Sequence, residues 1–265
     1  MTTLAPDLTT ARPPRPRPPH PRASFARLVA VECRKLVDTR AGLWLLLVIG
    51  LVTAAAIALM LFTAEPGSLT FANLALTSAV PQALLLPVLG VLAATAEWSQ
   101  RTGLVTFTLE PRRLRVGAAK LAAAVLVALL AVVVAATVGA LANLAGQLWL
   151  GGDGSWSLEA GQVGGAVLLQ VLGVVQGVAF GAAIGNSAAA IVALLVLPTV
   201  WSVLGAVVSW LEGPARWLDL SATSGPLLEG TMAGGDWARL ATSVALWVLL
   251  PLVVGTSRLV RREVA

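Results

Sequence analysis

A run of fifty residues without one charged side chain, positions 162–211, constrains this chain more than any other feature. About 20 apolar residues suffice to cross the hydrocarbon of a bilayer, so the run is too long for one crossing and must fold back within itself. The sequence GNSAAA, Gly185–Ala190, is the predicted turn, because Gly and Asn interrupt helices while the flanking residues are strongly apolar. The run therefore predicts two membrane-spanning helices.

Four further apolar stretches have the length of a membrane span. The chain is 57% hydrophobic and only 12% charged, against about 25% charged in an ordinary soluble domain. We therefore expect an all-α integral membrane protein, with a six-helix transmembrane domain over residues 41–265. Its spans are expected near residues 42–62, 74–95, 119–148, 162–184, 189–211 and 240–257.

The basic residues predict the orientation of these spans, since Lys and Arg near a span are retained on the cytoplasmic side. With six spans, sixteen of the eighteen Lys and Arg residues fall on one side, and only Arg216 and Arg239 fall on the other. Fusing the fourth and fifth spans would put the Arg-rich C-terminus outside. We expect a multi-pass protein of the cytoplasmic membrane with both termini in the cytoplasm.

The N-terminal region divides into a tail and a helix. Residues 1–22 are rich in Pro and Arg and offer almost nothing to bury, so we expect a disordered cytoplasmic tail, with a proline-motif ligand as the alternative. Residues 23–40 have a helical period of apolar and charged positions. This period predicts an amphipathic helix along the membrane surface.

Glu32 breaks the pattern of this helix, because at 100° per residue it points into the apolar face between Phe25 and Leu36. A charge on that face needs a partner. One interpretation pairs Glu32 with Lys35 one turn later and lets it reach water. The other docks Glu32 against the cytoplasmic connection after the second span, with Arg101 as the candidate partner.

That connection, EWSQRTGLVTFTLEPRRLRVGAAK at residues 97–120, gathers seven charged residues. Glu97 and Arg101 share a face if the helix of the second span continues through both. The segment LVTFTL alternates like a strand, but a lone strand is unstable, so we expect a short amphipathic helix. Pro111 prevents helix continuity through Glu110 and suits the start of the next helix. A stop-transfer cluster bound to lipid phosphate is the simpler interpretation of the basic residues.

Several classes of function are excluded or disfavoured. The two lysines, Lys35 and Lys120, do not fit a P-loop, so the chain has no ATPase site of that type. One cysteine, Cys33, and one histidine, His20 in the tail, do not suit a metal site or a Ser/His pair. The span interiors offer no ionisable relay, which disfavours an ion-coupled carrier. Basic residues beside apolar spans commonly face anionic lipid, so we expect no nucleic-acid binding. From the exclusions above we also expect no catalytic and no metal-binding residue.

Uncharged polar residues within the spans could line a path for an amphiphilic substrate, although hydrogen bonding between helices is the simpler role for each. They are Thr77, Ser78, Gln82, Asn143, Gln147, Gln170 and Gln176.

Glycine recurs at every fourth position of the fourth span, at Gly173, Gly177, Gly181 and Gly185. Successive Gly-x-x-x-Gly units let another helix approach closely. We expect a tight helix contact there, within the subunit rather than between subunits. The segment from 212 to 238, interrupted by Gly-Pro pairs, can hold two short helices on the outer side.

The basic entry helix with ECRKLVDTR and the connection EWSQRTGLVTFTLEPRRLRVGAAK resemble the permease subunits of type 2 ATP-binding-cassette exporters. The resemblance extends over residues 24–265 in the six-span layout, and it is specific only in these two motifs. It implies that both motifs contact a separate cytoplasmic ATPase subunit, which binds the ATP while this chain binds no cofactor. The implied coupling surface comprises Glu32, Lys35, Glu97, Arg101, Thr102, Pro111, Arg113 and Lys120.

The resemblance further implies a homodimer, or a pair with a related permease, that moves an unidentified substrate outward. The alternatives are a non-enzymatic membrane scaffold or immunity protein that binds a partner through the same basic surface, and, third, an ion-coupled carrier. Membrane lipid is an expected partner in each case.

Overall fold

The computed structural model describes residues 23–100 and 102–261, and every regular element within them is helical. Six helical segments are long and apolar enough to cross a membrane, so the predicted all-α membrane protein with six spans is confirmed. The predicted tail, residues 1–22, lies outside the described residues, as do Arg101 and Arg262. The six segments are α2 (Arg40–Thr63), α3 (Phe71–Ser99), α5 (Arg113–Trp149), α6 (Ala160–Ile184), α7 (Ser187–Val207) and the run Gly234–Arg261.

Shorter elements join these helices. The last run consists of α10 (Gly234–Val244), a π-helical turn (Ala245–Leu249) and α11 (Leu250–Arg261). The other short elements are α1 (Phe25–Asp38), α4 (Gly103–Leu109), α8 (Glu212–Leu218), α9 (Leu220–Glu229) and the 3-10 turns Pro66–Ser68 and Ser209–Leu211.

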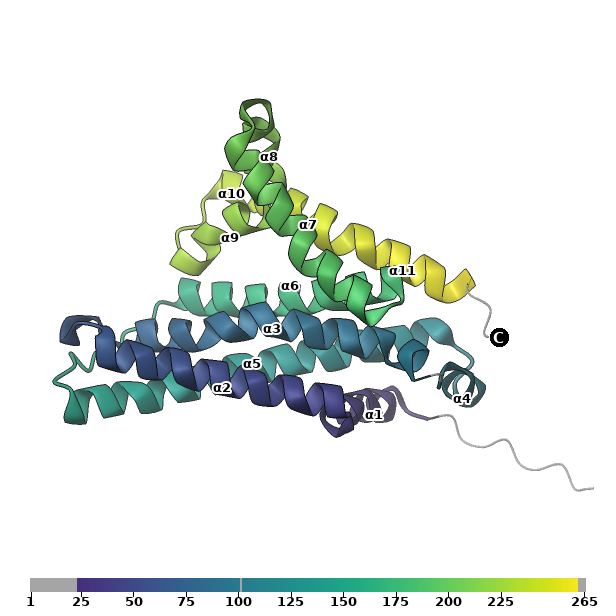
Figure 1. Ribbon diagram of the computed structural model, residues 1–265, viewed down its shortest axis with the longest axis horizontal. Coiled ribbons are helices and arrows are strands. Elements are labelled where there is room, and N and C mark those ends of the chain that lie inside the picture. The colour runs from purple at the N-terminus through teal and green to yellow at the C-terminus, as the bar shows by residue number, and fades with distance from the viewer. Residues whose placement is uncertain (1–22, 101, 262–265) are drawn as a thin grey trace, which may run out of the picture.

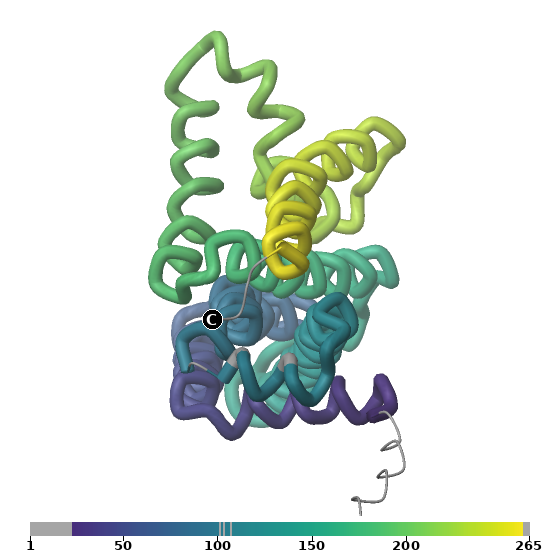
Figure 2. The backbone as a smooth tube through the Cα atoms, turned by 90° about the vertical axis from the view of Figure 1, so that its right-hand side faces the viewer, coloured from purple at the N-terminus to yellow at the C-terminus, as the bar shows by residue number. Residues whose placement is uncertain are grey.

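The long helices α2, α3, α5 and α6 lie side by side, and α7 and α11 diverge on the far side of α6 (Figure 1). Helix α3 is the centre of the bundle, because it packs against α2, α5 and α6 and is the most buried of the six. Figure 2 looks onto the end of the bundle where α1 and α4 lie crosswise, near the end of α11. This end carries α1 and the connection between α3 and α5, with Lys35 and Lys120 among their basic residues.

Glycines allow the close contact of α3 with α6. A Cβ atom added to Gly177 would lie 1.9 Å from the Pro87 carbonyl oxygen, and one added to Gly90 would lie 2.5 Å from the Val174 carbonyl oxygen. Gly181 likewise faces the α3 backbone, and Gly173 faces the Pro87 ring. Small residues at such positions let two helix backbones approach. The tight contact expected within the subunit is present at three of the four glycines of the series.

Gly185, the fourth glycine of the series, has a different role. It adopts a left-handed conformation with φ 73° and ends α6, as Gly commonly does one residue beyond a helix. The Asn186 side chain then accepts a hydrogen bond from the Ala189 backbone N–H at 3.0 Å and caps α7. The predicted turn between the fourth and fifth spans is therefore confirmed, and Gly185 belongs to that turn.

The connection between α3 and α5 forms the predicted short helix, α4, over Gly103–Leu109. Pro111 does not open the next helix as expected, since Arg112 is the N-cap and α5 begins at Arg113. Helix α5 has 37 residues, about 55 Å at ~1.5 Å per residue, against a hydrocarbon thickness of about 30 Å. It is therefore longer than one crossing of the hydrocarbon requires.

The segment after α7 forms the two predicted short helices, α8 and α9, and both pack against α10. Helix α8 lies near the apex above α7, and α9 lies lower and also packs against α6 (Figure 1). Hydrogen bonds join them to the last span: the Trp247 indole donates to the Leu218 carbonyl at 2.7 Å, and the Thr223 and Ser243 hydroxyls lie 2.7 Å apart. The segment is thus fixed to α10 and the turn that follows it.

Candidate functional site

Four charged side chains from three helices form a cluster at the end of the bundle that carries α1 and α4. Three of them are buried, and the fourth, Lys35, is 36% exposed. Lys35 of α1 donates to Glu32 Oε1 at 2.6 Å and to Glu97 Oε1 of α3 at 3.2 Å. Lys120 of α5 donates to Glu32 Oε2 at 2.8 Å and lies 2.6 Å from Glu97 Oε1. Each carboxylate therefore meets both ammonium groups. We call Glu32, Lys35, Glu97 and Lys120 the charge cluster.

Burial makes this pairing obligatory. Glu97 is 3% exposed, Glu32 is 7% exposed and Lys120 is 8% exposed. An unpaired ion at such depth costs several kcal/mol, whereas the cluster has two charges of each sign and no net charge. The Lys120 ammonium also donates to the Ala93 carbonyl at 3.1 Å. Removing one member would leave an uncompensated charge in the interior.

The cluster resolves both expectations for Glu32. The pairing with Lys35 is present, but Glu32 is buried rather than exposed to solvent as that interpretation required. Glu32 also docks against the far end of the charged connection, through Lys120. The candidate partner Arg101 lies outside the described residues. The helix of the second span ends at Ser99, so the continuation on which Glu97 and Arg101 would share a face is not formed.

Two side chains of α1 have shifted pKa values. Burial by itself would lower the pKa of Lys35, but the hydrogen bond and charge of Glu32, together with Glu97, outweigh burial and raise that pKa above its ordinary value. Burial raises the pKa of the Cys33 thiol, which keeps it protonated at neutral pH. Lys35 is thus held in its charged form.

A groove of about 1000 Å³ lies between α1 and α4, beside the charge cluster. Its lining includes Glu32, Lys35 and Glu97. Apolar side chains of both helices line it as well, among them Leu109, which is 81% exposed, and Val105, which is 61% exposed. Its remaining polar lining includes Arg27, Thr102, Glu110 and Arg112. We call this feature the entry groove.

The other residues of the predicted coupling surface divide between two faces. Thr102 and Pro111 are exposed and line the entry groove, and the Thr102 backbone N–H donates to the Glu97 carbonyl at 3.0 Å. Arg113 faces elsewhere, since its guanidinium donates to the Leu259 carbonyl of α11 at 3.2 Å. The structure therefore brings six of the eight residues to the cluster or groove, separates Arg113 from them and does not describe Arg101.

Arg115 links the two sides of the entry groove, and it was not included in the coupling surface expected from the sequence. Its guanidinium lies 2.7 Å from the Glu110 carboxylate and donates to the Ala23 carbonyl at 2.6 Å. These contacts tie the start of α1 to the connection between α4 and α5. The Glu110–Arg115 spacing of five is not a helical pairing distance, so the sequence carries no pattern that predicts the contact.

The uncharged polar residues of the spans form separate contacts. The buried Gln170 side chain donates to Gln82 at 3.5 Å, and Thr77 donates to the Met60 sulfur at 3.1 Å. Asn143 donates to the Ser155 carbonyl at 3.3 Å, while its Oδ1 has no partner. Of the remaining residues, Ser78 donates to the Leu74 carbonyl of its own helix, Gln176 is buried and Gln147 is exposed. Hydrogen bonding between helices therefore accounts for the Gln82–Gln170 pair.

In the part of the chain that the structure describes, no three His, Cys, Asp or Glu residues are grouped as metal ligands. No protein-family model matches this chain, and no curated protein matches its sequence. The assignment of a function therefore depends on the geometry of the charge cluster and the entry groove.

Proposed function

We propose that the chain is the membrane-spanning permease subunit of an ATP-driven exporter of the type 2 ATP-binding-cassette class, with ATP bound by a separate cytoplasmic subunit. The six apolar helical segments supply the membrane part. The two motifs that carry the family resemblance meet at one end of the bundle, where α1 and α4 flank the entry groove. That end would be the receiving surface for the ATPase.

The observation that carries the proposal is the position of the charge cluster between the groove and the membrane helices. Glu32 and Lys35 belong to α1, and they bind Glu97 of α3 and Lys120 of α5. Because the four charges compensate each other in a buried site, moving α1 alone would expose or orphan charge. A partner that displaces α1 would therefore move the ends of α3 and α5 with it.

The rest of the assembly follows from the same proposal. Both termini lie in the cytoplasm of a multi-pass protein of the cytoplasmic membrane, and α1 lies in the lipid interface. Two permease chains, identical or related, associate and recruit two ATPase subunits. The substrate moves outward, and its identity is open.

Reconstitution tests the proposal. The full chain is co-purified with the ATP-binding-cassette ATPase encoded beside its gene and placed in vesicles, and substrate-stimulated ATP hydrolysis is measured. The proposal predicts a stable complex whose hydrolysis depends on the permease. A scaffold or immunity protein would bind a partner without turnover, and an ion-coupled carrier would transport along an ion gradient without any ATPase.

A further inference from the structure

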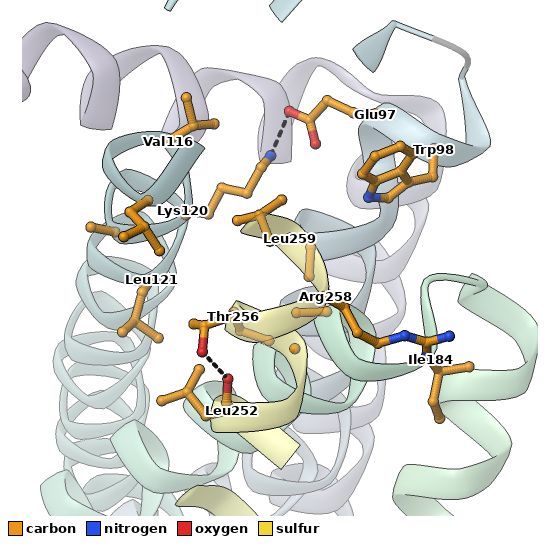
Figure 3. Close-up of a pocket in the computed structure, with 17 residues that line it drawn as sticks. Glu97, Trp98, Val116, Lys120, Leu121, Ile184, Leu252, Thr256, Arg258 and Leu259 are labelled. Atoms are coloured by element: carbon orange, nitrogen blue, oxygen red, sulfur yellow. Dashed lines mark hydrogen bonds and ion pairs between the residues drawn. The ribbon is translucent and has the colours of Figure 1, made fainter. Parts of the chain in front are cut away.

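A second cavity, of about 230 Å³, lies at the same end of the bundle (Figure 3), and Glu97 and Val116 line both this cavity and the entry groove. It is enclosed by the ends of four long helices, α3, α5, α6 and α11. Its wall is mostly apolar, with Trp98, Leu121, Val178, Leu252 and Leu259 among the lining residues. We call it the inner cavity.

The polar groups inside the inner cavity are already paired. The Glu97 carboxylate binds Lys120 at 2.6 Å, and the Thr256 hydroxyl donates to the Leu252 carbonyl at 2.9 Å (Figure 3). The rest of the wall away from Arg258 is mostly apolar, so the interior of the cavity suits an apolar body.

The rim of the inner cavity is basic. Arg258 of α11 is exposed and donates to the Ala183 carbonyl at the end of α6, a bond that leaves most of its guanidinium donors to other acceptors. Arg113 of α5 donates to the backbone of Leu259, a residue of the cavity wall. Arg261 is exposed one turn further along α11. The acid at this rim, Glu97, is neutralised by the cluster lysines.

We propose that the inner cavity binds one anionic phospholipid, with its phosphate at Arg258 and the first part of an acyl chain between α5, α6 and α11. An apolar interior beside exposed guanidinium groups matches an amphiphile with a negative head group. All four enclosing helices contribute residues within a few turns of their ends, the depth at which a head group meets acyl chains. The proposal does not depend on the transport function.

Trp98 lies in the cavity wall and reports on its contents. The full chain in neutral detergent is titrated with phosphatidylglycerol or phosphatidylcholine carrying brominated acyl chains, which quench tryptophan on contact. The difference between the parent chain and Trp98→Phe gives the quenching of Trp98 itself. Anionic lipid should quench Trp98 at a mole fraction lower by about fivefold than zwitterionic lipid.

Three variants separate a built site from general lipid contact. Arg258→Gln should weaken the binding of the anionic lipid about fivefold and remove the preference for anionic over zwitterionic lipid. Arg34→Gln, which removes an exposed arginine on α1 outside the cavity, should leave the preference intact. Gly117→Leu should reduce quenching by both lipids, because its added side chain would enter the cavity toward the flexible end of Leu259, 3.1 Å from the new Cβ.

Equal quenching by the two lipids, or no quenching of Trp98, would overturn the proposal. An equal loss in Arg258→Gln and Arg34→Gln would also overturn it, since overall charge would then explain the preference. If Gly117→Leu does not elute as a folded protein, the comparison of Arg258→Gln with Arg34→Gln still decides whether the lipid preference comes from the inner cavity.

Discussion

Glu32 and Lys120 lie 88 residues apart in the sequence and form an ion pair of 2.8 Å in the buried end of the bundle. The pair joins α1, which flanks the entry groove, to α5, the longest membrane helix. Because each residue also has a second partner of opposite charge, the pair belongs to a closed set of four. This arrangement leads to predictions about stability that do not require a known substrate.

Lys120→Met should destabilise the protein by about 3–5 kcal/mol, because it leaves Glu32 and Glu97 buried with one shared lysine. The double variant Glu32→Gln with Lys120→Met should lose less than the sum of the two single variants, since one charge of each sign is removed. Thermal unfolding in detergent measures the three variants. If the stability loss of the double variant equals the sum of the two single losses, the mutual pairing of the four charges is contradicted. A simple exchange of the two residues is not a clean test, because it puts like charges beside Lys35 and Glu97.

Alkaline pH should weaken the cluster through Lys35. The pKa of Lys35 is raised in the folded state. Its contribution to the free energy of unfolding is therefore fully present below the ordinary lysine pKa of about 10.5, and it is lost as pH rises through the folded-state pKa. The stability difference between the parent chain and Lys35→Met should therefore be constant from pH 6 to 9, within about a few tenths of a kcal/mol, and shrink only above that range. A difference that falls with pH near neutrality would disagree with this assignment.

Gly177→Ala should lower the stability by about 1–3 kcal/mol, because the new Cβ would overlap the Pro87 carbonyl oxygen at 1.9 Å and push α6 from α3. Gly164→Ala, on the same helix, is the matched control. Nothing lies within 4 Å of its added Cβ, so it should be neutral or stabilising by up to about 1 kcal/mol. Equal effects of the two changes on the melting temperature would show that the close contact is not present.

Cysteine labelling tests the orientation. In a Cys33→Ser background, Arg112→Cys should stay unlabelled by a membrane-impermeant maleimide in intact cells, whereas Trp156→Cys in the connection before α6 should be labelled. Permeabilised cells should label both positions, which shows that Arg112→Cys is reactive. Labelling of Arg112→Cys in intact cells would reverse the proposed orientation.

The spans and turns could be predicted from the sequence because their causes are local. The apolar runs fix the six membrane helices, and Gly185 with Asn186 marks the turn within the longest run. Pairing between distant helices could not be predicted in the same way. The partners of Glu97 depend on where α3 ends and how α5 is rotated, and neither follows from the residues around Glu97.

The contacts of the partly buried basic residues at the start of α5 could not be predicted from the sequence either. Arg113 and Arg115 are two positions apart in one motif, yet Arg113 contacts α11 while Arg115 holds the start of α1. Residues two apart in a helix point in different directions, and which neighbour each meets is set by the tertiary packing. The sequence therefore locates the basic motif but does not show which of its residues contact α11 and which contact the start of α1.

Capture of the ATPase by groove variants tests the central claim most directly. Leu109→Glu changes an exposed side chain of the entry groove, and Leu148→Glu makes the same change at the opposite end of the bundle, at the other end of α5. The amount of ATPase retained per permease is measured from membranes with matched expression. The account predicts a loss of about tenfold or more for Leu109→Glu, as for an interface residue worth over 1 kcal/mol, and none for Leu148→Glu. Unchanged capture by Leu109→Glu, or no capture by the parent chain, would contradict it.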